Sequence, residues 1–169
     1  MDADKKRYLD DIISTQIVPD LDIDIQPFLD FFETEEGSWY LDHRSRFVET
    51  YVRLCRNIAL NYSWKIAETG ELSGVSEFLR KQGYNVTALT GDFRYRIDRP
   101  DDSLDLLISL EVLEHIKDQD TANFDELVNF NFSGSEKFVA EIWRCVRSGW
   151  LCCAVYPKRM LVDKPFTPP

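Results

Sequence analysis

The chain has 169 residues, with 30 acidic against 20 basic side chains and a formal net charge of -10. This length suits one globular domain with a single core, and the 44% hydrophobic content excludes global disorder. A negative surface repels phosphate backbones and no basic cluster offsets the repulsion, so we expect no nucleic-acid partner. The charged start Met-Asp-Ala-Asp-Lys-Lys-Arg excludes a secretory signal, and the longest uncharged apolar run, Trp150–Val155, is far too short to span a bilayer. We therefore expect a cytoplasmic protein with no membrane partner.

The four cysteines do not have the spacing of a metal site. The adjacent pair would point to opposite faces of a strand. The four positions are Cys55, Cys145, Cys152 and Cys153. We expect reduced, buried thiols, as is usual in a cytosolic protein, and no bound metal.

Residues 1–42 form an acidic lead-in with two short predicted helices, Lys5–Ile13 and Ile25–Phe32. The next segment, His43–Tyr62, carries apolar residues at every third or fourth position, which is typical of an amphipathic helix that packs on a sheet. These positions are Phe47, Tyr51, Cys55, Ile58 and Tyr62. We place the domain boundary here, with 1–42 as a helical lead-in and 43–169 as a single globular domain.

From residue 65 the pattern changes to strand, turn, helix and strand. Lys65–Glu68 predicts a strand, Thr69–Gly74 a loop, and the following segment a helix that Gly83 ends with a left-handed cap. Asn85–Leu89 predicts the next strand, and the spacing fits a parallel strand–helix–strand unit with a right-handed crossover. The buried face of the helix comprises Val75, Phe78 and Leu79.

Four further elements follow. Leu104–Leu110 is a nearly continuous apolar run, typical of a parallel strand buried on both faces, and Asp105 is its single charge. Phe124–Phe132 has no clear period and predicts a loop that can carry function. Trp150–Tyr156 predicts one more buried strand, and the helix before it begins near Ser133 with the spacing of a capping box. The apolar face of that helix comprises Phe138, Val139, Ile142, Trp143 and Val146.

Alternating strands and helices of this kind predict an α/β fold, in which a doubly wound, mostly parallel sheet carries helices on both faces and N-terminal helices precede it. In such sheets ligands bind outside the carboxyl ends of the strands, near the point where the strand order reverses. Function is therefore expected at the ends of the predicted strands.

Two segments resemble the class I S-adenosylmethionine-dependent methyltransferases. The first is Glu68-Thr-Gly-Glu-Leu-Ser-Gly74, which leads into a helix. The second is Asp101-Asp-Ser-Leu-Asp-Leu-Leu-Ile-Ser-Leu-Glu-Val-Leu-Glu-His-Ile116, which is similar to the family's fourth-strand motif. Arg144-Cys-Val-Arg-Ser-Gly-Trp-Leu is similar to the helix end and glycine turn before the fifth strand, so the resemblance covers residues 43–157. It implies a Rossmann-like fold, an S-adenosylmethionine cofactor and methyl transfer.

The resemblance also implies where the cofactor is held. Backbone amides before Gly74 and the positive end of the following helix suit a carboxylate, while Glu68 either orders the glycine loop or simply faces water. Gly70 and Gly74 match the first and third glycines of the family loop, whereas Leu72 stands at the middle one. A branched side chain there either fills the site or displaces the loop. Glu111, at the end of the buried strand, either faces the ligand's amino group or makes a structural hydrogen bond.

Three further features depart from the family pattern. Thr90 stands where the family often places an acid for the two ribose hydroxyls, and Asp92 substitutes for that acid if the turn brings it round. The interval 89–101 is too short for the usual helix and third strand, which predicts a sheet reduced relative to the seven-stranded fold. The chain ends at Pro169, before the usual terminal hairpin, so the strand at Trp150–Tyr156 is expected to have an open apolar edge. A homodimer, a covering tail and a truncated chain are the alternatives at that edge.

Methyl transfer from a sulfonium is an in-line displacement, so the enzyme mainly has to align the reactants and exclude water. A general base is needed only when the nucleophile starts protonated. His115 is the candidate base because it follows the buried strand at the ligand end of the sheet; alternatively, Glu114 and His115 organise the loop. Arg44 is a candidate partner for a ligand carboxylate, or part of a solvated helix start. The candidates for a substrate-pocket wall, or for core packing, are Tyr40, Phe124, Phe130 and Phe132.

Two functions follow from these residues. The first is S-adenosylmethionine-dependent methyl transfer to a small molecule, such as a sugar, a lipid precursor or another metabolite. The second is a methyltransferase-like scaffold without catalysis that binds or regulates a protein partner, which Leu72, Thr90 and the missing hairpin favour. The first is preferred because a shifted loop can absorb one altered glycine, whereas the combined pattern rarely arises by chance. A nucleic-acid methyltransferase ranks third because of the charge.

Overall fold

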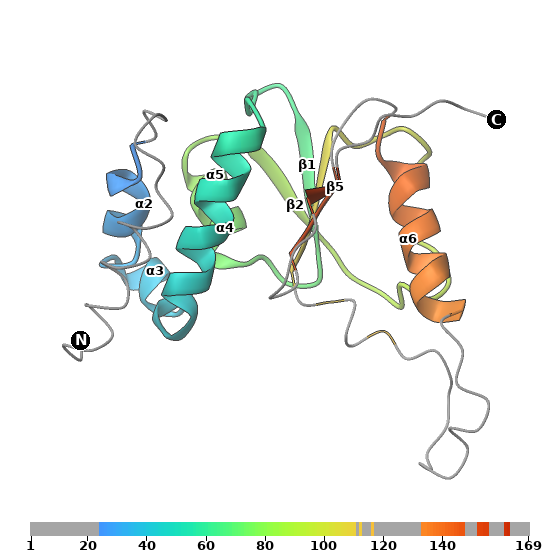
Figure 1. Cartoon of the computed structure of the whole chain (residues 1–169), viewed down its shortest axis with the longest axis horizontal. Helices are drawn as coiled ribbons and strands as arrows, with labels where there is room; N and C mark the ends of the chain where they lie inside the picture. The colour runs from blue at the N-terminus through green and yellow to red at the C-terminus, as the bar shows by residue number, and fades with distance from the viewer. Residues whose placement is uncertain are drawn as a thin grey trace, which may run out of the picture. The chain divides into compact units, whose positions relative to one another are not determined.

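The described part of the chain divides into two compact units (Figure 1). The helical unit comprises the residues up to Tyr62 together with Ser73–Gly83, and the sheet unit comprises Ser63–Leu72 and the residues from Tyr84 onward. The computed structural model describes residues 24–110, 112, 116 and 133–147, and the backbone of 152–155 and 161–162. The predicted helix Lys5–Ile13 and the predicted loop Phe124–Phe132 lie outside the described residues. The domain boundary at residue 42 stays a prediction.

Local sequence signals set the ends of the helices in the helical unit. These helices are α2 (Gln26–Phe31), α3 (Glu35–Ser38), the 3₁₀ helix η1 (Leu41–His43), α4 (Arg44–Asn57) and α5 (Gly74–Lys81). The Thr34 hydroxyl caps α3 by accepting the Gly37 N–H at 3.1 Å, and Ser73 caps α5 in the same way. Gly83, just after α5, has φ of +94°, which confirms the predicted left-handed cap.

An aromatic cluster forms the core of the helical unit. The ring of Phe28 is fully buried and lies on the rings of Tyr51 and Phe78, at centroid distances of 4.5 and 4.9 Å. Phe31 also contacts Phe78, at 5.8 Å. Each such pair contributes about 0.5–1.5 kcal/mol beyond the burial of its area, so aromatic packing joins α2, α4 and α5.

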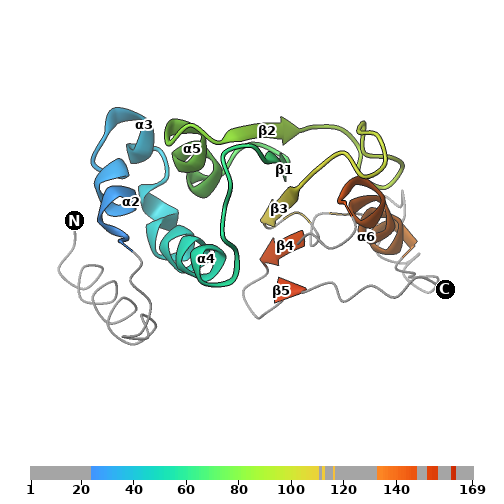
Figure 2. The same ribbon diagram turned by 90° about the horizontal axis from the view of Figure 1, so that it is seen from above.

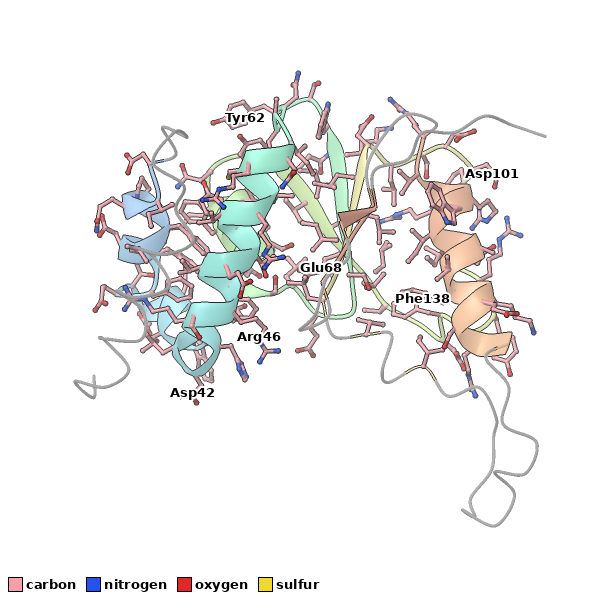
Figure 3. All side chains as sticks on the ribbon, in the orientation of Figure 1. Asp42, Arg46, Tyr62, Glu68, Asp101 and Phe138 are labelled. Carbon is pink, nitrogen blue, oxygen red and sulfur yellow. The ribbon has the colours of Figure 1, made fainter. Side chains whose placement is uncertain are left out.

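Helix α4 is shorter than the predicted segment His43–Tyr62. It ends at Asn57, and Tyr62 is 63% exposed, so the prediction of Tyr62 as a core position is wrong (Figure 3). The Asn57 side chain donates to the Arg53 carbonyl at 2.7 Å. Such a side-chain bond competes with the backbone hydrogen bonds of the helix, so asparagine favours the end of a helix. Ile58 then takes an extended conformation but stays buried, as predicted.

The sheet unit contains a five-stranded sheet in the order β2-β1-β3-β4-β5 (Figure 2). Its strands are β1 (Lys65–Thr69), β2 (Asn85–Leu89), β3 (Leu106–Leu110), β4 (Cys152–Val155) and β5 (Leu161–Val162). The first four strands are parallel and β5 is antiparallel. This confirms the α/β class and the mostly parallel, Rossmann-like sheet. No strand of the described chain lies beyond β2, so the sheet is reduced on that side, as predicted.

Helix α6 (Ser133–Cys145) packs on the sheet through one stripe of side chains. Phe138 and Ile142 are buried in a cluster with Ala67 of β1 and Leu107 of β3, and Figure 3 shows Phe138 between the helix and the strands. Val139 is 42% exposed, which contradicts its predicted place on the buried face. Because successive residues of a helix are separated by about 100°, Val139 lies to the side of the stripe that the sheet covers.

The open edge predicted for the strand at Trp150–Tyr156 is paired within the chain. The register places Cys152 of β4 opposite Val162 of β5 and Cys153 opposite Leu161. This pairing agrees with the covering tail at Cys152 and Cys153. The homodimer stays a prediction.

Candidate functional site

The carboxyl edge of the sheet is built around the end of β1. Because β1 lies between β2 and β3, the strand order reverses at β1, and parallel sheets bind ligands at such a point. Gly70, directly after β1, has φ of +88°, and its N–H donates to the Leu89 carbonyl of β2 at 2.8 Å. A side chain is strained in this conformation, so the turn requires glycine. The hydroxyl oxygens of Thr69 and Ser109, both buried, lie 2.8 Å apart and join β1 to β3.

The loop after β3 reaches the turn at Gly70. A Cβ atom built on Gly70 would lie 3.9 Å from Cγ2 of Val112, an ordinary van der Waals contact. Val112 therefore borders the backbone of Gly70 at the point of strand reversal. Glu111 and His115, the predicted contact to the ligand's amino group and the predicted base, lie outside the described residues.

Glu68 lies inside the sheet rather than in water. It is 1% exposed and stands opposite Ala88 of β2 and Ile108 of β3 in the strand register (Figure 3). The alternative that Glu68 is a solvent-facing strand end is therefore wrong. A carboxylate at this depth needs polar partners, which agrees with a role in organising the start of the loop. That role stays a prediction.

Packing explains Gly74 without a ligand. A Cβ atom at Gly74 would lie 3.0 Å from Cδ2 of Phe47 and 3.2 Å from Cβ of Tyr40, so a larger residue would push the first turn of α5 away from both. Glycine here allows close approach of elements within the helical unit. Leu72, two residues earlier, is half-buried, and its effect on a ligand stays a prediction.

Asp92 is held by its neighbour Arg94. The Arg94 Nε donates to one carboxylate oxygen at 2.9 Å and Nη2 to the other at 2.5 Å, while the Arg94 backbone N–H adds a bond of 3.1 Å. These hydrogen bonds hold the pKa of Asp92 below its ordinary range. The carboxylate is exposed, so a ribose could reach it only in competition with Arg94. Its role as the acid for the ribose hydroxyls stays a prediction.

The amino edge of the sheet contains a charged network that the sequence pattern did not reveal. Arg144 of α6 donates to the Asp101 carboxylate at 2.6 Å and to the carbonyls of Arg99 and Ile97 at 2.7 and 2.8 Å. It also pairs with Glu141 at 2.7 Å. The bond to Arg144 holds the pKa of Glu141 below its ordinary range, and Glu141 raises the pKa of Arg144 in turn. We call these residues the Arg144 network.

Asp105 joins the starts of β1 and β3. It is 4% exposed and accepts the Lys65 backbone N–H at 2.8 Å and Nη1 of Arg147 at 2.9 Å. The acidic segment 101–105, which carries much of the family resemblance, therefore stabilises the amino edge. Arg144 and Asp101 both lie in motifs that resemble the family. Their pairing could not be predicted from a local spacing, because they are 43 positions apart in the sequence.

Arg44 and His43 also have partners within the helical unit. The Arg44 guanidinium lies over the Phe32 ring at 5.5 Å and pairs with the Glu33 carboxylate at 3.4 Å. The guanidinium predicted as a partner for a ligand carboxylate therefore already has a carboxylate partner within the protein. Nδ1 of His43 lies 2.8 Å from Nη2 of Arg46. In the part of the chain that the structure describes, no three His, Cys, Asp or Glu side chains gather as metal ligands would. No helix of that part is long and apolar enough to cross a membrane.

No family model and no curated protein matches the sequence, whereas solved structures do. One is a chain from the complex between the Trm112 methyltransferase activator of Haloferax volcanii and a proposed methyltransferase, at 14% identity and a TM-score of 0.43, covering 74% of this chain and 59% of that one. Another is a SAM-dependent methyltransferase of Thermotoga maritima, described as a candidate histamine N-methyltransferase, at 15% identity and a TM-score of 0.38, covering 75% and 59%. This chain thus spans 59% of the length of each structure, and a likeness at these scores assigns it no activity, substrate or partner.

Proposed function

We propose that the chain is an S-adenosylmethionine-dependent methyltransferase that acts in the cytoplasm on a small molecule. One observation carries the proposal: the strand order reverses at β1, and the glycine turn at Gly70 directly follows that strand. This is the place where parallel α/β sheets bind nucleotides and related ligands. The segment at this place is also the one that resembles the family's glycine loop.

The residues around the turn at Gly70 allow such a ligand to approach the protein backbone. Gly70 has no side chain to keep a ligand away from its backbone, and Val112 supplies an apolar wall beside it. Thr69 and Ser109 place small, neutral side chains at the ends of the two central strands. Uncharged groups at a glycine turn suit a nucleoside, whose polar edges need hydrogen bonds rather than salt bridges.

In the proposed reaction the chain aligns the acceptor and removes its proton. S-adenosylmethionine, when bound, supplies a methyl group on a positively charged sulfur. Glu111, the residue after β3, is proposed to hold the amino end of the cofactor. His115 is proposed to take the acceptor's proton, which leaves the acceptor a lone pair for the methyl group that S-adenosylmethionine would supply. Water exclusion and alignment supply the rest of the rate enhancement.

The test is isothermal titration with S-adenosylmethionine and S-adenosylhomocysteine on the intact chain, Gly70→Ala and Gly83→Ala. Gly70 and Gly83 have nearly the same backbone strain, with φ of +88° and +94°, so the second variant is a matched control. We expect binding by the wild type, a loss of at least about tenfold in Gly70→Ala and no change in Gly83→Ala. Absence of binding of either compound to the wild type at millimolar concentration contradicts the proposal.

A second candidate is a methyltransferase-like scaffold without catalysis. Asp92 and Gly74 favour it, because each has a partner or a packing role inside the protein that requires no cofactor. Leu72→Gly separates the candidates. Tight cofactor binding by this variant alone means that the natural chain has lost its site, whereas equally tight binding by the wild type counts against the scaffold.

The small-molecule acceptor is supported by charge. A net charge of -10 opposes binding to nucleic acid, so a metabolite is preferred to a nucleic-acid acceptor. Transfer of a labelled methyl group in a cell extract, separated into low-mass and macromolecular fractions, tests this step. Label in the low-mass fraction alone supports it, and label in protein or nucleic acid alone contradicts it.

A further inference from the structure

The helical unit has a pocket of about 450 Å³ between α5 and the segment formed by α3 and the turn after it. This volume lies in the range of small-ligand sites in proteins. None of its residues belongs to the carboxyl edge of the sheet. The lining comprises Glu36, Trp39, Tyr40, Glu77, Arg80 and Lys81.

Two aromatic side chains form the apolar part of this pocket, and they differ in how they are held. The Tyr40 ring lies against Phe31 at 6.3 Å and Phe47 at 5.9 Å, so it is a fixed wall. Trp39 is 84% exposed, whereas Phe28 and Phe31 of the same unit are buried. An indole left in water beside a pocket is a surface that an apolar or flat ligand group can cover favourably.

Four charges surround these rings in two ion pairs. Lys81 of α5 pairs with Glu36 of α3 at 2.9 Å, and Arg80 pairs with Glu77 along α5 at 2.6 Å. The Glu36 and Lys81 side chains are 74% and 47% exposed, and ion pairs in water are weak enough to exchange partners. The bond from Lys81 also holds the pKa of Glu36 below its ordinary range, so Glu36 stays ionised at neutral pH.

This set of charges selects among ligand classes. A simple cation would meet Arg80 and Lys81, a simple anion would meet two carboxylates, and a neutral ligand would displace water from four charges without replacing its hydrogen bonds. A zwitterion meets an opposite charge already in place at each of its ends, so it can replace the Lys81–Glu36 pair with one bond to each partner.

We propose that this pocket binds a free amino acid, or a similar zwitterion, with an aromatic or large apolar side chain. The ligand carboxylate lies on Arg80 and Lys81, its ammonium lies on Glu36, and its side chain covers the Trp39 ring. The proposal is independent of the methyltransferase function, since it uses no residue of the sheet unit.

Calorimetry with three probes tests the charge requirement on the full chain without added cofactor. L-phenylalanine carries both charges, 2-phenylethylamine only the ammonium and 3-phenylpropionate only the carboxylate. We expect L-phenylalanine to bind at least about tenfold more tightly than either of the other two. Equal affinity for all three, or no binding of L-phenylalanine at millimolar concentration, overturns the proposal.

Variants test the location. Trp39→Ala is expected to weaken L-phenylalanine binding by about tenfold, whereas Tyr62→Ala, at an exposed aromatic outside the pocket, leaves it unchanged. Lys81→Met is expected to weaken it as well, and Arg53→Met, which breaks an ion pair with Glu49 on α4, is the matched control. All four side chains are substantially exposed, and circular dichroism confirms that each variant is folded. Undiminished binding in Trp39→Ala and Lys81→Met contradicts the assigned site.

Discussion

The two edges of the sheet differ sharply in chemistry. At the amino edge, the Arg144 network and the pair Asp105–Arg147 combine buried or half-buried charges with backbone carbonyls. At the carboxyl edge, Gly70 donates its N–H to the Leu89 carbonyl, and the hydroxyl groups of Thr69 and Ser109 bond to each other. The first edge holds the chain together with charged side chains, whereas neutral groups make the bonds at the point of strand reversal on the second.

This difference divides the family resemblance into two parts. Asp101 and Asp105 before β3 bond to Arg144 and Arg147 inside the protein, so these two acids support the fold and carry no information about a ligand. At the glycine turn after β1, the Gly70 N–H bonds to the Leu89 carbonyl, and no charged side chain takes part in that bond. A motif can therefore match a family strongly through residues that stabilise the fold. The proposed function depends instead on the fewer residues at the carboxyl edge.

The largest effect is expected from Arg144→Ala. The Arg144 side chain is 19% exposed, and its removal takes the donor from two carbonyls and leaves Glu141 with the bond from the Ile97 N–H, so we expect a loss of about 3 kcal/mol in the free energy of unfolding. Urea denaturation measures it. Arg144→Lys should recover only part of the loss, because a lysine cannot reproduce the guanidinium geometry. A loss as small as that of Arg53→Ala, at an exposed ion pair, would contradict the structural role of the amino edge.

Gly70→Ala and Gly83→Ala should each lower the free energy of unfolding by about 1–2 kcal/mol, because both glycines have left-handed backbone. The two losses should agree closely in urea denaturation. The variants should differ only in cofactor affinity, which makes this pair a sharp comparison between a glycine at the proposed site and one outside it. If both variants lose the same cofactor affinity, the loss in Gly70→Ala comes from backbone strain and not from a contact with the cofactor.

Asp105→Asn should have a smaller effect, of about 1 kcal/mol, because the amide oxygen can still accept the Lys65 N–H while the charge pair with Arg147 is lost. Thermal or urea denaturation measures the change. If the variant is as unstable as Arg144→Ala, the ion pair with Arg147 contributes more stability than expected relative to the bond from Lys65.

Glu141→Gln should change the acid dependence of stability. Since the folded pKa of Glu141 is lowered, its contribution is fully present above the unfolded pKa of about 4.3 and is lost as the pH falls through the folded value. Replacement should therefore make the fall in stability below that pH less steep. Urea midpoints measured at several acidic pH values check this, and an unchanged slope would contradict it.

The smallest effect on stability is expected from Asp92→Asn. The carboxylate is exposed, so the unfolding midpoint should stay unchanged. If Asp92 accepts the ribose hydroxyls, cofactor affinity should fall by about tenfold. Unchanged affinity would leave Asp92 as a partner of Arg94 alone.

The sequence predicted the elements whose signals are local. The pattern of strand, turn, helix and strand predicted β1 and β2, and a nearly continuous apolar run predicted β3. The cap at Gly83 followed from glycine chemistry, and the reduced sheet followed from the length of the interval 89–101. The misses have a common cause in longer-range structure. The exposure of Val139 depends on which stripe of α6 the sheet covers, and the Arg144 network joins segments 43 or more positions apart.

For the candidate site, the sequence predicted the position of the turn after β1. The conformation of Gly70 follows from a glycine between a strand and a helix, as the loop pattern indicated. The packing role of Gly74 against Tyr40 could not be predicted, because contact with the turn before α4 depends on tertiary structure. The hydrogen bonds between Arg94 and Asp92 could have been predicted from their spacing of two residues, because a turn brings such side chains together.

The most direct test of the account is a titration of the ¹⁵N-labelled chain with S-adenosylmethionine, followed by amide chemical shifts. The account predicts shifts at Gly70, Ser109 and Val112, on the carboxyl edge, and none at Asp101 or Arg144 on the amino edge. Saturable shifts confined to the amino edge, or none at all, would contradict it.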